Sequence, residues 1–306
     1  MIDSTEGKSV RSEDEINLSE LFFIIWQRKF FIVSLSLAFA VSSVFYALSL
    51  PNVYISDLVL KVAGSSNAGM SQNSQFGSIA ALAGVSLGSS SGMDEKADLA
   101  KQTIKSRDFA KHISSFDMVL PSIMALKEYD SSSESIIFDE ETYDSEDNKW
   151  ITSPPNDFDT HKKILSMVDV YIDIDTGFLA ISVKHRSPYF AKSFLELIIR
   201  ELNNIERDRA IAEAKRSKEY LNQQLNIYRV ADIRNSINAL IQSQLETEML
   251  ANVRQDYLLR PLDSAYIPQK KSAPARSVIC IAITFFGFLL ATFIVLIRYY
   301  FFKATS

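Results

Sequence analysis

Cysteine is almost absent from this sequence of 306 residues. The single cysteine, Cys280, lies inside a long apolar run near the C-terminus. The rest of the chain therefore holds no disulfide, which excludes a small secreted domain stabilised by disulfide bonds. For the same reason, cysteine usage indicates neither an oxidising nor a reducing compartment.

Clusters of basic residues are also absent. The chain has 32 Lys and Arg against 37 Asp and Glu, a net charge of −5. Its one strong local bias is acidic, because residues 128–159 hold eleven Asp or Glu and one Lys. Binding to nucleic-acid phosphates needs clustered Lys and Arg, so nucleic acid is not an expected partner.

Motifs that carry catalysis are missing as well. The sequence has no Gly-x-x-x-x-Gly-Lys-Ser/Thr loop for nucleotide phosphates. Residues 84–88 match the Gly-x-Ser-x-Gly pattern of a hydrolase nucleophile, but the strand and helix that must flank such a nucleophile are not indicated. We interpret these residues as part of a loop of small side chains.

Metal-binding residues show no suitable spacing. His112, His161 and His185 are far apart in the sequence, and we interpret them as structural histidines. Residues 144–148 resemble the start of a calcium loop. The sixth position of that loop is not glycine and its twelfth is Pro155, which excludes an EF-hand.

Three aspartates, Asp169, Asp173 and Asp175, fall on one face of a predicted strand. Carboxylates on the polar side of a half-buried strand are commonly solvated, so we do not interpret them as a catalytic group. The sequence therefore predicts no catalytic residue, no metal site and no cofactor, and we do not expect an enzyme.

Two long runs without charge dominate what the sequence does contain. Residues 30–50 form a run of 21 and residues 278–297 a run of 20. Each can cross a bilayer as a helix, which takes about 20 residues. Two spans exclude a polytopic channel or a soluble enzyme. They leave residues 1–29, 51–277 and 298–306 outside the membrane.

The first run has a second interpretation as a cleaved signal peptide, because residues 47–49 offer a small-x-small cleavage site. Its apolar stretch is too long for a signal peptide, and the 29 residues before it are too many and too acidic. We therefore expect an uncleaved span. The second run would anchor the protein in either case.

Basic residues at the ends of the spans predict the orientation. Arg28 and Lys29 precede the first span and two further basic residues follow the second, which places both tails in the cytoplasm. Lys270, Lys271 and Arg276 argue the opposite way, but a translocated region of this length crosses largely regardless of its charge. The large middle region is thus predicted to be extracytoplasmic, which in a Gram-negative cell means periplasmic.

The middle region is predicted to begin and end close to the membrane. Residues 53–62 are rich in Val, Ile, Leu and Tyr and predict a strand. Residues 260–276 contain three prolines and predict an extended return segment that pairs near that strand. Residues 64–92 hold six of the nine glycines and predict a flexible loop.

The next segments differ in pattern. Residues 94–126 predict helix, with an N-cap at Ser106 or Asp108 and a break at Pro121. The acidic, serine-rich residues 130–159 predict a solvated surface insertion.

A hairpin and a long helix complete the pattern. Residues 168–175 and 178–185 alternate apolar and polar side chains around a Thr-Gly turn, which predicts a hairpin with one buried face. Residues 189–260 are 72 residues without Gly or Pro. Their apolar positions predict one very long helix, or two nearly collinear ones, of about 100 Å. The rest of the chain is too short to cover such a rod, which indicates that it packs against another subunit.

Several segments, taken in order, resemble the Wzz-type chain-length determinants, the polysaccharide co-polymerases of Gram-negative inner membranes. No single motif is decisive, but their order between two terminal spans is specific. The segments are residues 16–26 before the first span, Pro51 and Tyr54, residues 82–88, residues 103–109, the turn 175–177 and residues 268–276.

This resemblance implies an α+β membrane protein. Two transmembrane helices flank a periplasmic domain that has a membrane-proximal α/β base and a very long extended helix. It also implies a homo-oligomer in a closed ring, with eight subunits as one candidate number. The chain ends nine residues after the second span, so we expect none of the cytoplasmic tyrosine kinase that one branch of the family carries.

The implied function is non-enzymatic. Such a protein sets the modal length of lipopolysaccharide O-antigen, or of a related glycan, that a Wzy-type polymerase makes. The implied partners are that polymerase and the growing polysaccharide. We expect the loop 64–92 and the acidic stretch 128–159 to tune the length.

Two other classes of protein stay open. A periplasmic adaptor or scaffold of a polysaccharide or solute export complex also uses long helices, although it usually has one anchor and a helical hairpin. A sensor that lacks its output domain shares the two-span layout, although a sensor is expected to carry a cytoplasmic signalling domain.

Overall fold

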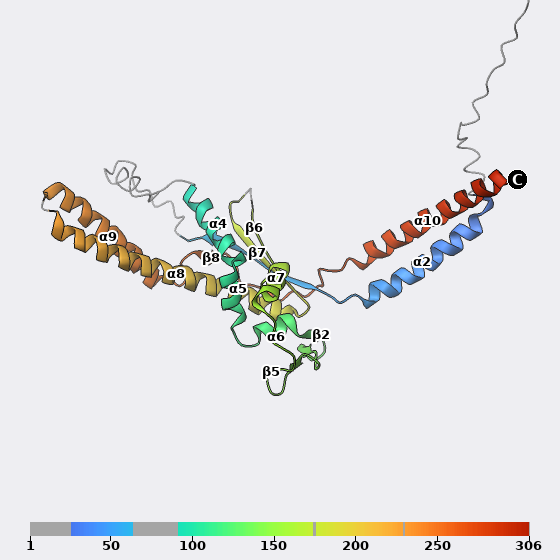
Figure 1. Ribbon diagram of the computed structural model, residues 1–306, viewed down its shortest axis with the longest axis horizontal. Helices are drawn as coiled ribbons and strands as arrows, with labels where there is room; N and C mark the ends of the chain where they lie inside the picture. Colours follow the sequence, from blue (N-terminus) through green and yellow to red (C-terminus); the bar gives the residue numbers. More distant parts are fainter. Residues whose placement is uncertain (1–25, 64–90, 174–175, 229, 306) are drawn as a thin grey trace, which may run out of the picture. The chain divides into compact units, whose positions relative to one another are not determined.

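The computed structural model describes residues 26–63, 91–173, 176–228 and 230–305 (Figure 1). The chain divides into two compact units. One unit is formed by the regions near the two chain ends, up to residue 51 and from residue 273. The other, which we call the middle domain, is residues 52–272.

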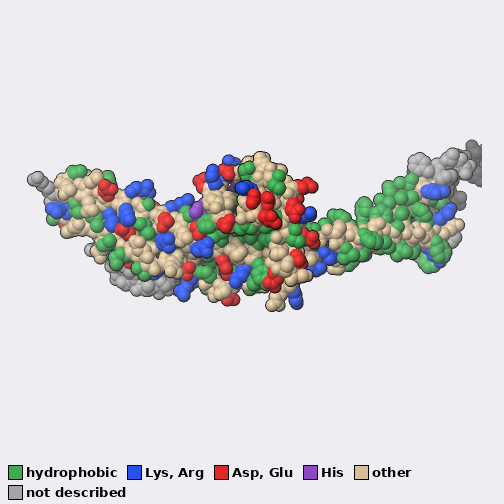
Figure 2. All heavy atoms as spheres, turned by 90° about the horizontal axis from the view of Figure 1, so that it is seen from below, with side chains coloured by type: hydrophobic (Ala, Val, Ile, Leu, Met, Phe, Trp, Pro, Cys, Tyr) green, Lys and Arg blue, Asp and Glu red, His purple; other side chains and the backbone are tan. Residues whose placement is uncertain are grey.

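Within the described residues, the first unit consists of two helices. Helix α2 (Lys29–Ser49) and helix α10 (Arg276–Thr305) contain the two apolar runs and pack side by side (Figure 1). Both are long and apolar enough to cross a membrane, α10 over Arg276–Tyr299. Their surface is almost entirely apolar in Figure 2, as expected for helices surrounded by lipid.

Small residues let these two helices approach closely. Ser43 and Ala47 are buried on α2, and Gly287 and Ala291 are buried on α10. A Cβ atom added at Gly287 would lie 2.6 Å from the Cβ of Phe39, which is closer than real side chains come. Glycine is therefore required where α10 crosses α2.

A four-stranded antiparallel sheet forms the centre of the middle domain. Its strand order is β6-β7-β1-β8, so β1 pairs with the predicted hairpin on one side and with the return segment on the other. The predicted pairing of the two segments next to the spans is confirmed by the register of Leu60 opposite Pro261. The strands are β1 (Tyr54–Val62), β6 (Val168–Ile172), β7 (Leu179–His185) and β8 (Leu259–Pro261).

Helices cover one face of this sheet and form the core with it. Leu60 of β1 and Leu179 of β7 are fully buried in this core. On β6, Val168 and Val170 are buried while Asp169 is exposed, as the period-two pattern predicted. The predicted hairpin is therefore confirmed, with one buried face along β6, whereas β7 is buried on both faces from Leu179 to Val183.

Residues 94–126, predicted as helix, form three helices. The predicted cap at Ser106 is confirmed, because its Oγ accepts a hydrogen bond from the backbone N–H of Phe109 at 3.1 Å. The predicted break at Pro121 is wrong. Pro121 lies in the first turn of a helix, where its missing N–H removes no hydrogen bond, and the chain bends at Met118, which has φ of 59°. The helices are α4 (Ser91–Lys105), α5 (Arg107–Ser114) and α6 (Val119–Met124).

The acidic residues 130–159 are more regular than a solvated insertion. Tyr143 packs edge-on against Phe138 and Trp150, with ring centroids 5.3 and 5.2 Å apart. The acidic side chains serve the turns, since Asp144 Oδ1 accepts a hydrogen bond from the backbone N–H two residues later at 2.9 Å. The elements here are β2 (Leu126–Asp130), β3 (Ser135–Phe138), β4 (Tyr143–Asp144), β5 (Lys149–Trp150) and α7 (Asp157–Met167).

The predicted rod over residues 189–260 is correct in its first half and wrong in its second. Helix α8 (Pro188–Ile227) has 40 residues, which gives a length of about 60 Å. The chain then reverses, and helix α9 (Ala231–Val253) runs back along α8 (Figure 1). Lys218 on α8 forms an ion pair with Glu248 on α9, 30 positions later in the chain. Collinear helices would hold these two residues about 45 Å apart.

The reversal has a tertiary cause. No Gly or Pro marks it, and the chain leaves α8 at Tyr228 in extended conformation. Folding back lets apolar positions of the two helices cover each other, so that Ala214 on α8 and Ile237 and Ala251 on α9 are buried. We call α8 and α9 together the arm.

Candidate functional site

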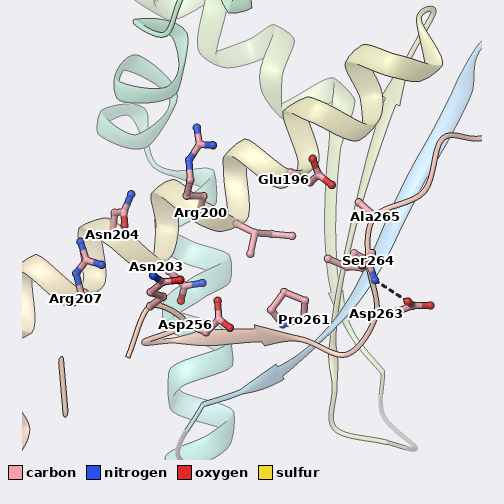
Figure 3. Close-up of a pocket in the computed structure, with 13 residues that line it drawn as sticks. Glu196, Arg200, Asn203, Asn204, Arg207, Asp256, Pro261, Asp263, Ser264 and Ala265 are labelled. Carbon is pink, nitrogen blue, oxygen red and sulfur yellow. Dashed lines mark hydrogen bonds between the residues drawn. The ribbon is translucent and has the colours of Figure 1, made fainter. Parts of the chain in front are cut away.

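A groove of about 510 Å³ lies between the first half of α8 and the segment that follows α9 (Figure 3). Leu58 of β1, Pro261 and Ala265 contribute its apolar surface. Charges of both signs line it, so the groove does not select for one charge. Its polar side chains are Glu196, Arg200, Asn203, Asn204 and Arg207 on α8, and Gln255, Asp256, Asp263 and Ser264 opposite.

Asn203 fixes the geometry of this groove. Its side chain is buried, and its Oδ1 accepts hydrogen bonds from the backbone N–H groups of Leu258 and Leu259 at 2.8 and 2.9 Å. Its Nδ2 donates to the carbonyl oxygen of Leu259 at 2.8 Å. One amide thus satisfies backbone groups that a neighbouring strand would otherwise pair. A single Asn in a long helix forms no motif, so sequence pattern alone does not identify this residue.

Glu201 joins α8 to α5. Its carboxylate is mostly buried and lies 3.0 Å from His112 Nε2 and 3.2 Å from Arg200 Nε. Burial raises the pKa of Glu201, but hydrogen bonds from His112 and Arg200 outweigh it and hold the pKa of this carboxyl below its usual value. The charged form of Glu201 therefore holds the two helices together.

Glu206 joins α8 to α4 in a similar way. It accepts hydrogen bonds from Thr103 Oγ1 on α4 at 3.1 Å and from Arg209 Nη1 on its own helix at 2.6 Å. Because each buried carboxylate has charged or polar partners, both fit a structural role in fixing the position of α8.

The structure keeps the three histidines apart. His112 contacts α8 as described, and His161 Nε2 lies 2.9 Å from the carbonyl oxygen of Lys105. His185 is buried, with Nε2 3.1 Å from the carbonyl oxygen of Ser122. These contacts agree with their interpretation as structural histidines. Among the described residues, no group of three or more His, Cys, Asp or Glu could hold a metal ion.

The acidic residues weighed as catalytic or calcium-binding candidates serve turns or contact solvent. Asp144 caps the turn between β4 and β5, and Asp169 is exposed on β6. Asp173 Oδ1 accepts a backbone hydrogen bond at 3.2 Å within the turn that follows β6. Asp175 and residues 84–88 lie outside the described residues.

The arm carries an apolar stripe that its own chain leaves exposed. Leu245, Met249 and Val253 recur every four residues on α9 and are 45, 59 and 80% exposed. Figure 2 shows such apolar side chains along the arm between interspersed basic and acidic ones. Exposed apolar stripes of this kind mark contacts with another polypeptide.

These features define the class of protein. Two helices long enough to cross a membrane flank one α+β domain, and a long helical arm extends from the sheet. The predicted fold class, with its two terminal apolar helices and a long helix, is confirmed. The described side chains form a groove beside α8 and an exposed apolar stripe on α9.

Comparison with known proteins gives the family to which the first third of the chain is similar. Residues 14–115 match the family model of Wzz, the chain length determinant protein. Among solved structures, a full-length bacterial polysaccharide co-polymerase is similar to this chain at 12% sequence identity. The similarity has a TM-score of 0.39 and covers 94% of this chain and 99% of that chain. No curated protein sequence matches the chain.

The family match confirms the resemblance to Wzz-type chain-length determinants that the order of motifs predicted. The matched residues include α2, which is the first apolar helix, and β1, α4 and α5 of the middle domain. The match supports a role in regulating polysaccharide chain length. The two apolar helices fit a protein of the inner membrane.

Proposed function

We propose that this protein sets the modal length of lipopolysaccharide O-antigen, or of a related glycan, without making or breaking bonds itself. The observation that carries the proposal is the Wzz family match over residues 14–115. Two apolar helices that flank one domain support it, because this layout holds a domain at a membrane surface. In this proposal the middle domain is periplasmic and both termini are cytoplasmic.

We infer that the protein acts as a homo-oligomer in a closed ring. Because α9 covers part of α8, the prediction that neighbouring subunits bury a single rod over residues 189–260 is wrong. The exposed stripe of Leu245, Met249 and Val253 supports self-association instead. In a ring, each stripe would contact a different face of the next subunit, and no stripe would stay uncovered. A Wzy-type polymerase and the growing glycan would be partners of this ring.

An export adaptor is the main competing function. A continuous rod without a helical hairpin would count against an adaptor. That prediction is wrong, because α8 and α9 form a helical hairpin. What favours the chain-length determinant is the family match together with a second membrane-length helix directly after the return segment.

Deletion of the gene tests the proposed function. We expect the lipopolysaccharide ladder on a gel to lose its modal cluster of O-antigen lengths, and the full-length gene to restore that cluster. A ladder with an unchanged length distribution would contradict the O-antigen assignment.

Purification of the full chain in detergent separates a chain-length determinant from an adaptor. We expect a stable closed oligomer without any outer-membrane protein, measured by mass photometry and negative-stain electron microscopy. A stable monomer, or a complex that forms only with an outer-membrane protein, would favour the adaptor.

A further inference from the structure

An apolar pocket of about 290 Å³ lies where the chain enters strand β1. It is separate from the groove beside α8, with which it shares no residue. Its apolar wall is formed by Val53, Ile123, Met124, Leu126 and Met167.

Three cations complete the lining of this pocket. They are Lys163 on α7, Lys184 on β7 and Arg186 just after β7. Arg186 Nη1 donates a hydrogen bond to the carbonyl oxygen of Lys127 at 2.8 Å. Within the described part of the chain, no carboxylate forms an ion pair with any of the three. Lys163 and Lys184 are exposed and Arg186 is partly exposed, so all three cations are accessible to a ligand that enters the pocket.

His185, the remaining residue of the lining, reports on the local charge. Burial, helped by the charges of Lys163 and Arg186, lowers its pKa from 6.5 to about 4. Its Nδ1 accepts a hydrogen bond from the backbone N–H of Ser187 at 3.0 Å, so the proton of the neutral ring is on Nε2. The imidazole is therefore uncharged at neutral pH and adds no charge of its own to the pocket.

Short chain connections join the lining of this pocket to both apolar helices. Val53 follows the last residue of α2 by four positions, and its carbonyl oxygen accepts a hydrogen bond from the backbone N–H of Ser272 at 2.9 Å. Ser272 in turn precedes the first residue of α10 by four positions. Four residues reach at most about 14 Å, so both links are short.

Two more cations come with this connection. Lys270 and Lys271 directly precede Ser272, and both are exposed. Their positive charges favour the orientation opposite to the predicted one, in which both termini are cytoplasmic. The proposed chain-length function gives these two lysines no role. They do not line the pocket, but they directly precede Ser272, whose backbone N–H donates to the carbonyl oxygen of Val53.

We propose that this pocket binds the phosphate headgroup of an anionic phospholipid of the bilayer that α2 and α10 enter. Lys163, Lys184 and Arg186 would contact the phosphate, which guanidinium and ammonium groups bind by charge-assisted hydrogen bonds. The apolar wall would take the adjoining acyl-chain carbons. Lys270 and Lys271 would contact neighbouring headgroups. Such binding would hold the sheet at the membrane surface, whatever the middle domain does there.

The test measures lipid-dependent stability of the full chain. Delipidated protein in a neutral detergent is heated with increasing phosphatidylglycerol or phosphatidylcholine, and the midpoint of unfolding gives an apparent affinity for each lipid. We expect phosphatidylglycerol to raise the midpoint more than phosphatidylcholine. Each Lys or Arg near anionic lipid contributes roughly a five-fold factor, so Lys163→Gln, Lys184→Gln and Arg186→Gln together should weaken binding about 100-fold at low salt.

A matched control removes the same charge elsewhere. The exposed residues Lys96, Lys215 and Arg216 lie outside the pocket, and their change to Gln should leave the response to phosphatidylglycerol intact. If the triple pocket variant does not fold, the exposed Lys184→Gln alone should weaken the response about five-fold.

Three results would overturn the proposal. Equal stabilisation by the two lipids would show that the pocket does not select an anionic headgroup. Equal responses of the pocket variant and the control would show that net charge alone decides. Saturation by inorganic phosphate that abolishes the effect of phosphatidylglycerol would show a site for free phosphate. None of these outcomes depends on the glycan ladder, so this proposal and the proposed function fail separately.

Discussion

At the scale of single residues, Asn203 does more than its position in a long helix indicates. It is the side chain that ties α8 to the return segment through hydrogen bonds with both Leu258 and Leu259. We expect Asn203→Ala to destabilise the protein by about 2–4 kcal/mol, because it leaves buried backbone groups without partners. Denaturant unfolding of the solubilised full chain measures this. The control is Asn222→Ala, at an exposed position of the same helix. A loss equal to that of the control would contradict the role given to Asn203.

His185 makes stability depend on pH at the same scale. The unfolded chain binds a proton at this residue below pH 6.5, whereas the folded chain binds it only below about 4. Acidification from 6.5 to 4 therefore favours the unfolded state, and the stability present above pH 6.5 falls by roughly 3 kcal/mol. We expect His185→Gln to flatten the dependence of the unfolding free energy on pH in this window.

His161 provides the comparison for that experiment. Its ring is partly exposed and contacts one backbone carbonyl, so His161→Gln removes an imidazole without changing the buried site of His185. If both variants show the slope of the unchanged protein, burial of His185 does not govern stability in this range.

At the scale of elements, the crossing of α2 and α10 depends on Gly287. Any side chain there meets Phe39 on α2. Ile32 and Val295 are buried together in the contact between the helices, so cysteines at these two positions should form a disulfide in a Cys280→Ser background. We expect Gly287→Leu to lower the cross-linking yield several-fold. Ala282→Leu, at an exposed position of α10, should leave it unchanged. Equal yields would show that the helices do not cross at Gly287.

The reversal between α8 and α9 is a second prediction at this scale. Lys218→Cys and Glu248→Cys, in the same Cys280→Ser background, should be joined within one chain by a short bismaleimide cross-linker, since the native side chains form an ion pair. Denaturing gel electrophoresis then shows a cross-linked monomer with altered mobility. Collinear helices would hold these positions about 45 Å apart, and the cross-link would be absent or would join two chains.

At the scale of the whole molecule, the exposed stripe on α9 should control self-association. Leu245→Ser, Met249→Ser and Val253→Ser remove apolar surface that is exposed in the single chain, so folding should be unaffected. Burial of such side chains contributes roughly 1–2 kcal/mol each, and we expect at least a 10-fold increase in the dissociation constant of the oligomer. Light scattering in detergent measures it. An unchanged mass would show that the subunits meet elsewhere.

Much of the molecule follows from local pattern. The apolar runs are long enough to cross a membrane as helices, and a helix pairs its backbone groups within itself, as lipid requires. Alternation along β6 predicted its buried face, and the hydroxyl of Ser106 identified a helix start. Each of these signals lies within a few residues of the structure that it specifies.

The errors share one physical reason, which is that distant segments decided the outcome. The pattern of residues 189–260 predicted a rod, since a helical period does not show whether the chain continues straight or turns back in a second helix. The acidic composition of residues 130–159 gave no sign of the aromatic contacts of Tyr143. Pro121 predicts a helix break, but the first turn of a helix accepts proline, and Pro121 lies in the first turn of α6. Asn203 and the pocket beside Val53 gave no signal, because their partners lie far away in the sequence.

The sequence by itself determined that the protein has two membrane-length helices, a strand soon after the first of them, a hairpin and a long helix, because hydropathy and periodicity are local properties. It also carried the order of motifs that the Wzz match confirmed. Only the tertiary structure decided that the arm is a hairpin with its stripe on α9, and that three cations meet around an apolar pocket. Both result from packing between segments that are distant in the chain, where the free energy of burial exceeds local preference.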